Sequence, residues 1–158
     1  MTKHSLKVGL GFGIASGVIT TLGLMIGLFS STNSKAAVMG GILTIAFADS
    51  LADALGIHLS EESKGIHSAK EIWLSTIFTF IVKLLITLSF IPLIFILSLK
   101  TGMIINIIWG FSLLSFYSYF MAKRQNKNAY KAVFEHVSIM LVVIVASYYL
   151  GEWIDKMY

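Results

Sequence analysis

The sequence contains no cysteine, a single proline and few charged residues. Without cysteine, the chain cannot form a disulfide framework, a zinc–thiolate site or a redox dithiol. Charged residues make up 13% of the 158 residues, against about 25% in a typical soluble domain. Hydrophobic residues make up 56%, and the mean hydropathy is +0.83. The composition indicates an all-α membrane protein made of one transmembrane domain over residues 1–158.

Five apolar segments account for most of the chain. They cover about residues 6–29, 36–59, 72–99, 103–121 and 132–150. Each is close to the roughly 20 residues that a spanning helix needs. The first is longer than the apolar part of a signal peptide, which has about 7–15 residues, so we expect it to stay in the membrane. The sequence therefore predicts a bundle of five transmembrane helices, with Pro92 inside the third.

Lysine and arginine are distributed unevenly between the two ends of these segments. Eight lie on the side of the N-terminus and three on the opposite side, while Lys83 lies inside the third segment. The eight are Lys3, Lys7, Lys64, Lys70, Lys123, Arg124, Lys127 and Lys131, and the three are Lys35, Lys100 and Lys156. Basic residues collect on the cytoplasmic side of membrane proteins. We therefore expect a cytoplasmic N-terminus, and we attribute the net charge of +4 to topology rather than to nucleic-acid binding.

Glycines recur at helical spacing in the first segment. Gly9, Gly13 and Gly17 form two overlapping G-x-x-x-G steps, and Gly23 and Gly27 form a third. Small residues four positions apart let a neighbouring helix approach closely in lipid. This face has two interpretations, which are packing within one subunit and the seam of a homodimer.

The stretch FADSLADALGIHLSEES, residues 47–63, places two carboxylates in an otherwise apolar helix. Asp49 and Asp53 are four residues apart, so they share one face, which Gly56 and Ser60 continue. A charge at the centre of a membrane helix costs about 2.5–3.5 kcal/mol on insertion scales, and like charges on one face also repel. Such a pair needs compensation by a metal cation, by shared protons or by a basic side chain.

Lys83 is the basic side chain that the sequence offers. Lys83 and Asp49 lie at similar depths in adjacent segments, roughly 16 Å from the N-terminal side at about 1.5 Å per residue. A short connection makes these helices antiparallel neighbours. An Asp49–Lys83 ion pair of purely structural value is therefore one hypothesis, although it leaves Asp53 unexplained.

Further metal-ligand types gather on the side of the N-terminus. They are His58, Glu61 and Glu62 in the second segment, His67 in the following loop, and Glu135 and His136 at the start of the fifth segment. Carboxylate and imidazole without thiolate suit Fe(II), Mn(II) or Zn(II). The alternative is that the loop residues are solvated and that Glu135 and His136 are interfacial residues at a helix start, where an acid also favours the helix dipole.

Three stretches resemble the vacuolar iron transporter family. They are GFGIASGVITTLGLMIGL in the first segment, GGILTIAFADSLADALGIHLSEES in the second and AYKAVFEHVSIMLVVIVASYYLGEWI in the last. The resemblance covers nearly the whole chain and rests mostly on small residues. It implies five transmembrane helices, a cytoplasmic N-terminus, a dimer, and export of Fe(II) or Mn(II) from the cytosol in exchange for protons.

The chain departs from the family pattern at several positions. The family's first-helix aspartate falls on Ser16, and its second-helix methionine falls on Asp53. The glutamate-rich segment between the second and third helices is missing, and Lys83 has no family counterpart. Only Glu61, Glu62, His67 and Glu71 remain in that region. Two hypotheses follow: the pore acid has moved from the first helix to the second, or the pore has been lost.

The leading hypothesis is a homodimeric transporter of Fe(II) or Mn(II) in a prokaryotic plasma membrane, with lipid, metal and protons as partners and no permanently bound cofactor. The expected transport path contains Ser16, Asp49, Asp53 and Lys83, and the expected metal ligands are Asp49, Asp53, His58, Glu61, Glu62 and Glu135. The alternative is a non-transporting membrane scaffold in which Asp49–Lys83 is an internal ion pair. No HExxH or serine–histidine pairing is present, so we do not expect an enzyme.

Overall fold

The computed structural model describes residues 2–157, which form six α-helices joined by short turns. They are α1 (Thr2–Thr32), α2 (Lys35–Ser63), α3 (Ala69–Leu88), α4 (Ile91–Ile96), α5 (Leu99–Arg124) and α6 (Ala129–Asp155). Within this described range, five segments are long and apolar enough to cross a membrane. The prediction of an all-helical chain with five candidate spans is therefore confirmed.

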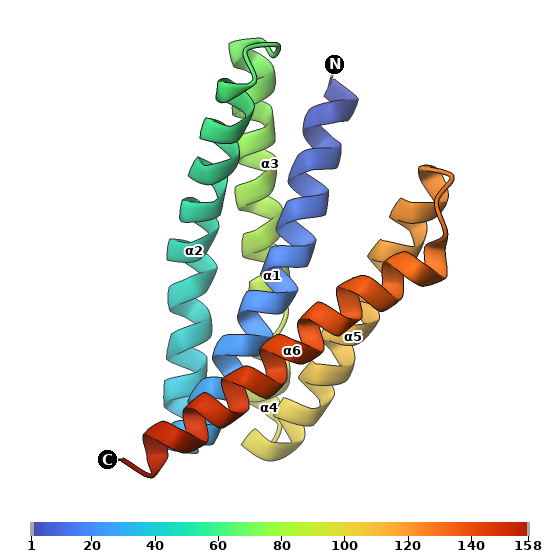
Figure 1. Cartoon of the computed structure of the whole chain (residues 1–158). Helices are drawn as coiled ribbons and strands as arrows, with labels where there is room; N and C mark the ends of the chain where they lie inside the picture. Colours follow the sequence, from blue (N-terminus) through green and yellow to red (C-terminus); the bar gives the residue numbers. More distant parts are fainter. Residues whose placement is uncertain (1, 158) are drawn as a thin grey trace.

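The spans alternate in direction, so the turns fall at two opposite ends of the molecule. The start of α1, the α2–α3 turn and the α5–α6 turn lie at one end, and the α1–α2 turn and the end of α6 lie at the other (Figure 1). We call these the N-terminal end and the opposite end. This arrangement places the basic residues in the two groups that the sequence predicted.

Polar residues in the turns explain where the helices begin. The side chains of Ser34, Ser98 and Asn128 accept hydrogen bonds from backbone N–H groups in the first turns of α2, α5 and α6. Such N-caps satisfy donors that have no partner inside the helix. Because Ser98 caps α5, this helix begins at Leu99 and includes residues 100–102, which lie between the third and fourth apolar segments expected from the sequence.

The predicted third helix, 72–99, is not continuous, and this is a correction. α3 ends at Leu88, and the short helix α4 begins at Ile91. Pro92 has no N–H group to donate to the carbonyl of Leu88, and its ring would clash with that carbonyl in a continuous helix, whereas proline is tolerated in the first turn of α4. The chain therefore makes a turn at Ser89 and Phe90 before α4 completes the span.

Side chains from two other helices satisfy carbonyls around this break. The Asn106 Nδ2 atom of α5 donates to the carbonyl of buried Phe90 at 3.0 Å. The ammonium of Lys35 at the start of α2 donates to the carbonyls of Phe95 and Leu97, at 2.9 and 3.0 Å. Backbone groups inside a bilayer must find partners within the protein. These contacts allow the break to lie inside the third span.

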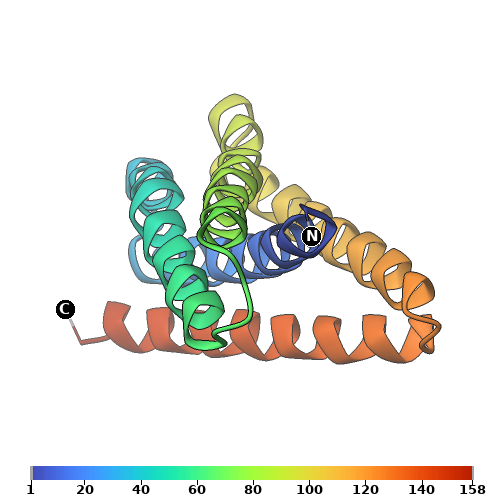
Figure 2. The same ribbon diagram turned by 90° about the horizontal axis from the view of Figure 1, so that it is seen from above.

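α1 occupies the centre of the bundle, with α3 on one side and α6 on the other (Figure 2). A Cβ atom on Gly9 would lie 2.6 Å from Phe78 Cβ and 2.9 Å from the Thr79 backbone nitrogen of α3. On α1 further along, a Cβ on Gly23 would lie 2.9 Å from Val143 of α6. The α1 glycines therefore pack within one subunit, and the hypothesis of a homodimer seam on this face was wrong.

The apolar core lies mostly toward the opposite end. Most of its members come from the second half of α1, the first half of α2, and α4. The buried cluster comprises Val18, Leu22, Met25, Ile26, Val38, Ile42, Phe90, Ile94, Met103, Leu114 and Met140. The half of the bundle near the N-terminal end is consequently held together by smaller and more polar side chains.

Candidate functional site

A stripe of buried polar residues runs along α3. Its members recur every four residues, so they share one face of the helix. They are Glu71, Ser75, Thr79, Lys83 and Thr87, and all are buried. Ser75 and Thr79 donate to the carbonyls four residues before them, which satisfies their hydroxyls inside the span. Lys83 is therefore the only charged member of the stripe within the middle of the span.

α1 presents a matching row of small residues to this stripe. The row comprises Ser5, Gly9, Gly13, Gly17 and Thr21. At its two ends, Ser5 donates to the Glu71 carbonyl at 3.0 Å and Thr21 donates to the Thr87 hydroxyl at 3.2 Å. A Cβ on Gly13 would lie 3.1 Å from the Lys83 backbone nitrogen. The glycines thus let α1 lie directly on α3, which brings Ser16 within reach of the lysine.

The ammonium of Lys83 is bound by three oxygen atoms from two helices. It lies 2.5 Å from Asp49 Oδ2 and also pairs with Asp53 Oδ2, both on α2. It donates to Ser16 Oγ on α1 at 2.9 Å, and Ser16 in turn donates to Asp53 Oδ2 at 2.5 Å. These four residues, which we call the Lys83 cluster, are the four that the sequence placed on the transport path.

The Lys83 cluster lies midway through the spans. Asp49 is the central residue of α2, and Lys83 lies at the middle of the span Ala69–Ile96. Two carboxylates face one ammonium, so the fully ionised cluster carries a net charge of −1. No other lysine or arginine pairs with either aspartate in the described part of the chain. The cluster is therefore incompletely neutralised at a depth where charge is costly.

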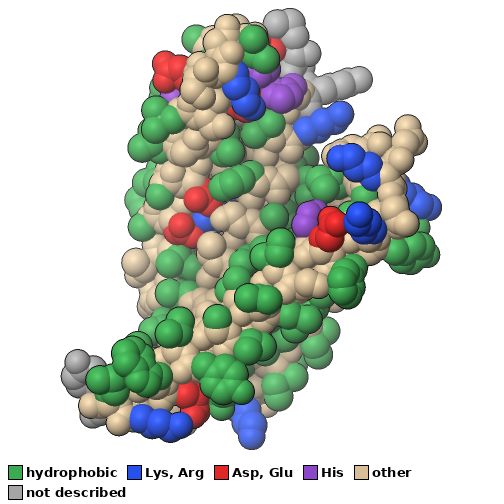
Figure 3. Space-filling model, viewed as in Figure 1, with side chains coloured by type: hydrophobic (Ala, Val, Ile, Leu, Met, Phe, Trp, Pro, Cys, Tyr) green, Lys and Arg blue, Asp and Glu red, His purple; other side chains and the backbone are tan. Residues whose placement is uncertain are grey.

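The carboxylates reach the molecular surface, whereas the lysine does not. The side chains of Asp49 and Asp53 are 31% and 21% exposed, and that of Lys83 is 0% exposed. Acidic side chains emerge midway along the bundle on the face drawn in Figure 3. A cation or a second protein can thus approach the carboxylates from outside the subunit.

A row of small, exposed residues on α2 lies beside these carboxylates. It comprises Gly40, Thr44, Ala48, Ala52, Gly56 and Ser60, again at a spacing of four. A Cβ on Gly40 or Gly56 would meet no atom within 4 Å in the same chain. In contrast to the glycines of α1, the residues of this row are exposed, and Gly40 and Gly56 pack against no other part of the described chain. We call it the α2 small-residue face.

Glu61, a predicted metal ligand, lies at the N-terminal end and is only 3% exposed. Its Oε2 atom contacts His4 Nε2 at 3.0 Å and His67 Nε2 at 3.3 Å, and its Oε1 atom contacts the Lys64 ammonium at 2.5 Å. Of these partners, the sequence analysis named only His67, as a metal-ligand type in the loop after the second segment. His4 was not predicted as a ligand, because a single histidine near the start of the sequence belongs to no recurring pattern of ligand-type residues.

Two predicted ligands on α2 point elsewhere. His58 Nδ1 lies 3.0 Å from the Thr76 hydroxyl of α3, and its ring packs edge-on against Trp73. The structure therefore does not bring His58 to Glu61. Glu62 directly follows Glu61 in the sequence, so it lies on a different side of α2, where it is exposed.

Glu71 accepts hydrogen bonds from the backbone and hydroxyl of Ser68, which caps the start of α3.

The structure also separates Glu135 from the other predicted ligands within one subunit. Glu135 is 57% exposed on α6, and its nearest charged partner is Lys131 at 3.9 Å. The adjacent His136 lies 2.7 Å from the Ser118 hydroxyl of α5. The first turns of α6 diverge from α2 and α3 at the N-terminal end (Figure 1), which is the reason that Glu135 does not join Glu61.

No family model, no curated protein and no solved structure matches the chain. Function is therefore inferred from the geometry and charge of the site.

Proposed function

We propose that the chain is a homodimeric transporter that moves Fe(II) or Mn(II) out of the cytosol in exchange for protons. The observation that carries the proposal is the Lys83 cluster, in which two carboxylates and one ammonium lie midway through the spans with the carboxylates accessible. Ionisable groups at such depth are costly and usually mark ion or proton pathways.

The charge imbalance of the cluster favours a cation as its substrate. With Lys83 protonated, one of the two carboxylates lacks a compensating charge. A proton or a metal ion supplies it, and a carboxylate cannot bind both at once, because a protonated carboxylate is a poor ligand. Asp49 and Asp53 therefore provide a physical basis for exchange of metal for protons.

Lys83 acts in this proposal as an internal counter-ion. Its ammonium occupies the space between Asp49 and Asp53, so a divalent ion that binds both carboxylates must displace it. When the metal leaves, the ammonium returns and prevents two unpaired charges from facing the membrane. Ser16, which contacts both Lys83 and Asp53, orients the two groups and offers a neutral oxygen to the ion.

A second copy of the chain would cover the carboxylates. Hydrocarbon in contact with Asp49 and Asp53 would leave charge unsolvated, so this face needs either protein or water against it. The adjacent α2 small-residue face allows close approach of another helix, as small residues do in membrane proteins. We place the dimer seam along this face, so that the two Lys83 clusters line a shared path.

The basic residues indicate how the chain is oriented in the membrane. With eight of the twelve lysines and arginines on the N-terminal side, the N-terminal end faces the cytosol. Metal would then approach past Glu61 and Glu62 and leave at the opposite end. The direction itself, out of the cytosol, is what the resemblance of three stretches to the vacuolar iron transporters implies.

A non-transporting scaffold is the second candidate, and one observation favours it. The three hydrogens of the Lys83 ammonium have three oxygen partners, Asp49, Asp53 and Ser16, so the lysine is fully satisfied. An internal ion cluster accounts for both aspartates in this way, whereas a single Asp49–Lys83 pair did not account for Asp53.

Metal flux into proteoliposomes distinguishes the two candidates. The purified protein is reconstituted, and uptake of Mn(II) and of Fe(II) is measured separately with and without a pH gradient. The transporter predicts saturable uptake that increases when the gradient drives protons the opposite way. Uptake equal to that of empty liposomes, from a folded protein, would leave the scaffold as the function.

A further inference from the structure

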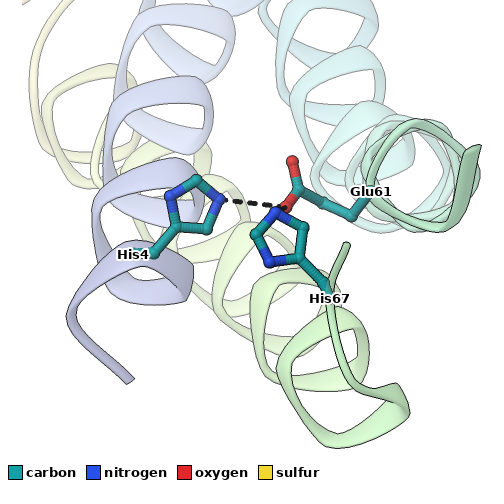
Figure 4. A group of neighbouring side chains, drawn as sticks. All are labelled: His4, Glu61 and His67. Atoms are coloured by element: carbon teal, nitrogen blue, oxygen red, sulfur yellow. Dashed lines mark hydrogen bonds and ion pairs between the residues drawn. The ribbon is translucent and has the colours of Figure 1, made fainter. Parts of the chain in front are cut away.

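Three side chains from separate parts of the chain converge at the N-terminal end. His4 comes from the first turn of α1, Glu61 from the last turn of α2, and His67 from the α2–α3 turn (Figure 4). One ligand-type atom from each of the three lies within 4.8 Å of the other two. They are separate from the Lys83 cluster, which lies midway through the spans.

Both imidazoles direct the same nitrogen at the same oxygen. His4 Nε2 and His67 Nε2 lie 3.0 and 3.3 Å from Glu61 Oε2. The two rings are stacked, with centroids 4.6 Å apart and an angle of 17° between their planes. Neighbouring ligand atoms around an ion with bonds of about 2.0–2.1 Å are about 2.8–3.0 Å apart in octahedral geometry and about 3.3–3.4 Å apart in tetrahedral geometry. The observed separations from Glu61 match that spacing.

The surroundings fit a metal ligand set better than an ordinary surface cluster. Glu61 is 3% exposed, so its carboxylate is held in place, while His67 is 15% and His4 is 46% exposed. An ion could therefore reach the group from the His4 side. Lys64 holds the other carboxylate oxygen, Oε1, at 2.5 Å and leaves Oε2 for the ion.

Two imidazoles and one carboxylate define the class of ion. Mg²⁺ and Ca²⁺ prefer ligand sets made of oxygen, whereas imidazole suits Zn(II), Fe(II), Co(II) and Ni(II). For a set of this kind, affinity rises from Mn(II) through Fe(II) and Co(II), and Zn(II) binds more tightly than Mn(II). The three side chains would fill three coordination positions of the ion, and water would fill the others.

We propose that His4, Glu61 and His67 form a binding site for one divalent transition-metal ion, which joins the start of α1 to the α2–α3 turn. The site does not depend on the transport activity proposed above. Lys64 competes with the ion for the charge of Glu61, because its ammonium already neutralises that carboxylate. Removal of the lysine charge should therefore strengthen metal binding, whereas removal of any ligand should weaken it.

The test is metal binding to the full chain, purified in detergent without a histidine tag. Zn(II) binding is measured by competition with a chelating dye, and Co(II) binding is followed by its visible absorption. To remove any contribution of the Lys83 cluster without leaving the buried lysine unpaired, both measurements use the triple variant Asp49→Leu, Asp53→Leu, Lys83→Met. We expect one tight equivalent per chain in this background, with Mn(II) weaker than Zn(II).

Single substitutions then identify the ligands. His4→Gln and His67→Gln should each weaken Zn(II) binding at least tenfold, and Lys64→Gln should strengthen it. The matched controls are His58→Gln and His136→Gln, because these histidines are bonded to Thr76 and Ser118 instead. The side chain of His4 is 46% exposed and that of His67 is 15% exposed, so both reach the surface, and gel filtration should show folded protein in each case.

Two results would overturn the site. One is Zn(II) affinity that is unchanged in folded His4→Gln and His67→Gln variants. The other is an equal loss of affinity in the His58→Gln control, which would place the ion elsewhere. Because the background lacks both aspartates, failure here leaves the transport proposal intact, and loss of transport leaves this site intact.

Discussion

The ammonium of Lys83 lies 2.5 Å from a carboxylate oxygen of Asp49, and both residues occupy the middle of their membrane spans. The pair joins α3 to α2 midway along both spans. Asp53, one turn further along α2, and Ser16, on α1, complete the cluster. We expect the stability of the fold and the proposed transport both to depend on how these charges are neutralised.

Removal of Lys83 should destabilise the fold strongly. Lys83→Met leaves Asp49 and Asp53 facing each other without a counter-ion, and loss of one partner from a buried ion pair costs about 3–5 kcal/mol. The triple variant Asp49→Leu, Asp53→Leu, Lys83→Met should recover most of that stability. Thermal unfolding of the detergent-solubilised protein measures both effects, with exposed Lys70→Met as the control. A Lys83→Met protein as stable as the wild type would show that the cluster is not needed for folding.

Asn106 should contribute to stability through the break between α3 and α4. Its side-chain nitrogen donates to the carbonyl of buried Phe90 at 3.0 Å, and Asn106→Leu would leave that carbonyl without this partner. An unsatisfied buried acceptor costs about 1–3 kcal/mol. Thermal unfolding should show this loss for Asn106→Leu and almost none for Ser112→Ala on the same helix, whose hydroxyl bonds only to its own helix. Equal stability of the two variants would mean that Asn106 does not support the break.

Two glycine substitutions should have different consequences. Gly9→Ala places a Cβ 2.9 Å from a backbone nitrogen of α3, and overpacking of this kind costs about 1–3 kcal/mol, so the subunit should lose stability. By contrast, a Cβ on Gly56 would meet no atom within 4 Å in the described part of its own chain, so the side chain of Gly56→Leu has open space beside the helix. It should therefore leave the subunit folded and separate the proposed dimer. Light scattering in detergent measures the mass, and a Gly56→Leu protein that stays dimeric would place the seam elsewhere.

Much of the Lys83 cluster could be predicted from the sequence, because helical period and span length fix both face and depth. The i,i+4 spacing put Asp49 and Asp53 together, and a short connection put Lys83 opposite them. That Lys83 contacts both aspartates could not be predicted. It depends on the rotation of α2 about its axis, which is set by packing rather than by spacing.

The rows of small residues on α1 and α2 also show that sequence spacing does not identify the packing partner of a helix. A spacing of four predicts that a face packs closely against another helix, but it does not identify that helix. The row on α1 packs against α3 of the same chain, whereas the exposed row on α2 is the one beside the carboxylates. Likewise His4, Glu61 and His67 come from α1, α2 and the α2–α3 turn, and they meet only because the helices pack together. No local sequence pattern predicts that convergence.

The most direct test of the central claim is Mn(II) flux through the Asp49→Asn, Asp53→Asn double variant in proteoliposomes with a pH gradient. Exposed Glu135→Gln serves as the matched control, because it also removes a carboxylate but lies away from the cluster. We expect wild-type flux from the control and flux no higher than that of empty liposomes from the double variant. Flux at the wild-type level from a folded double variant would contradict the proposal that these two aspartates carry the metal.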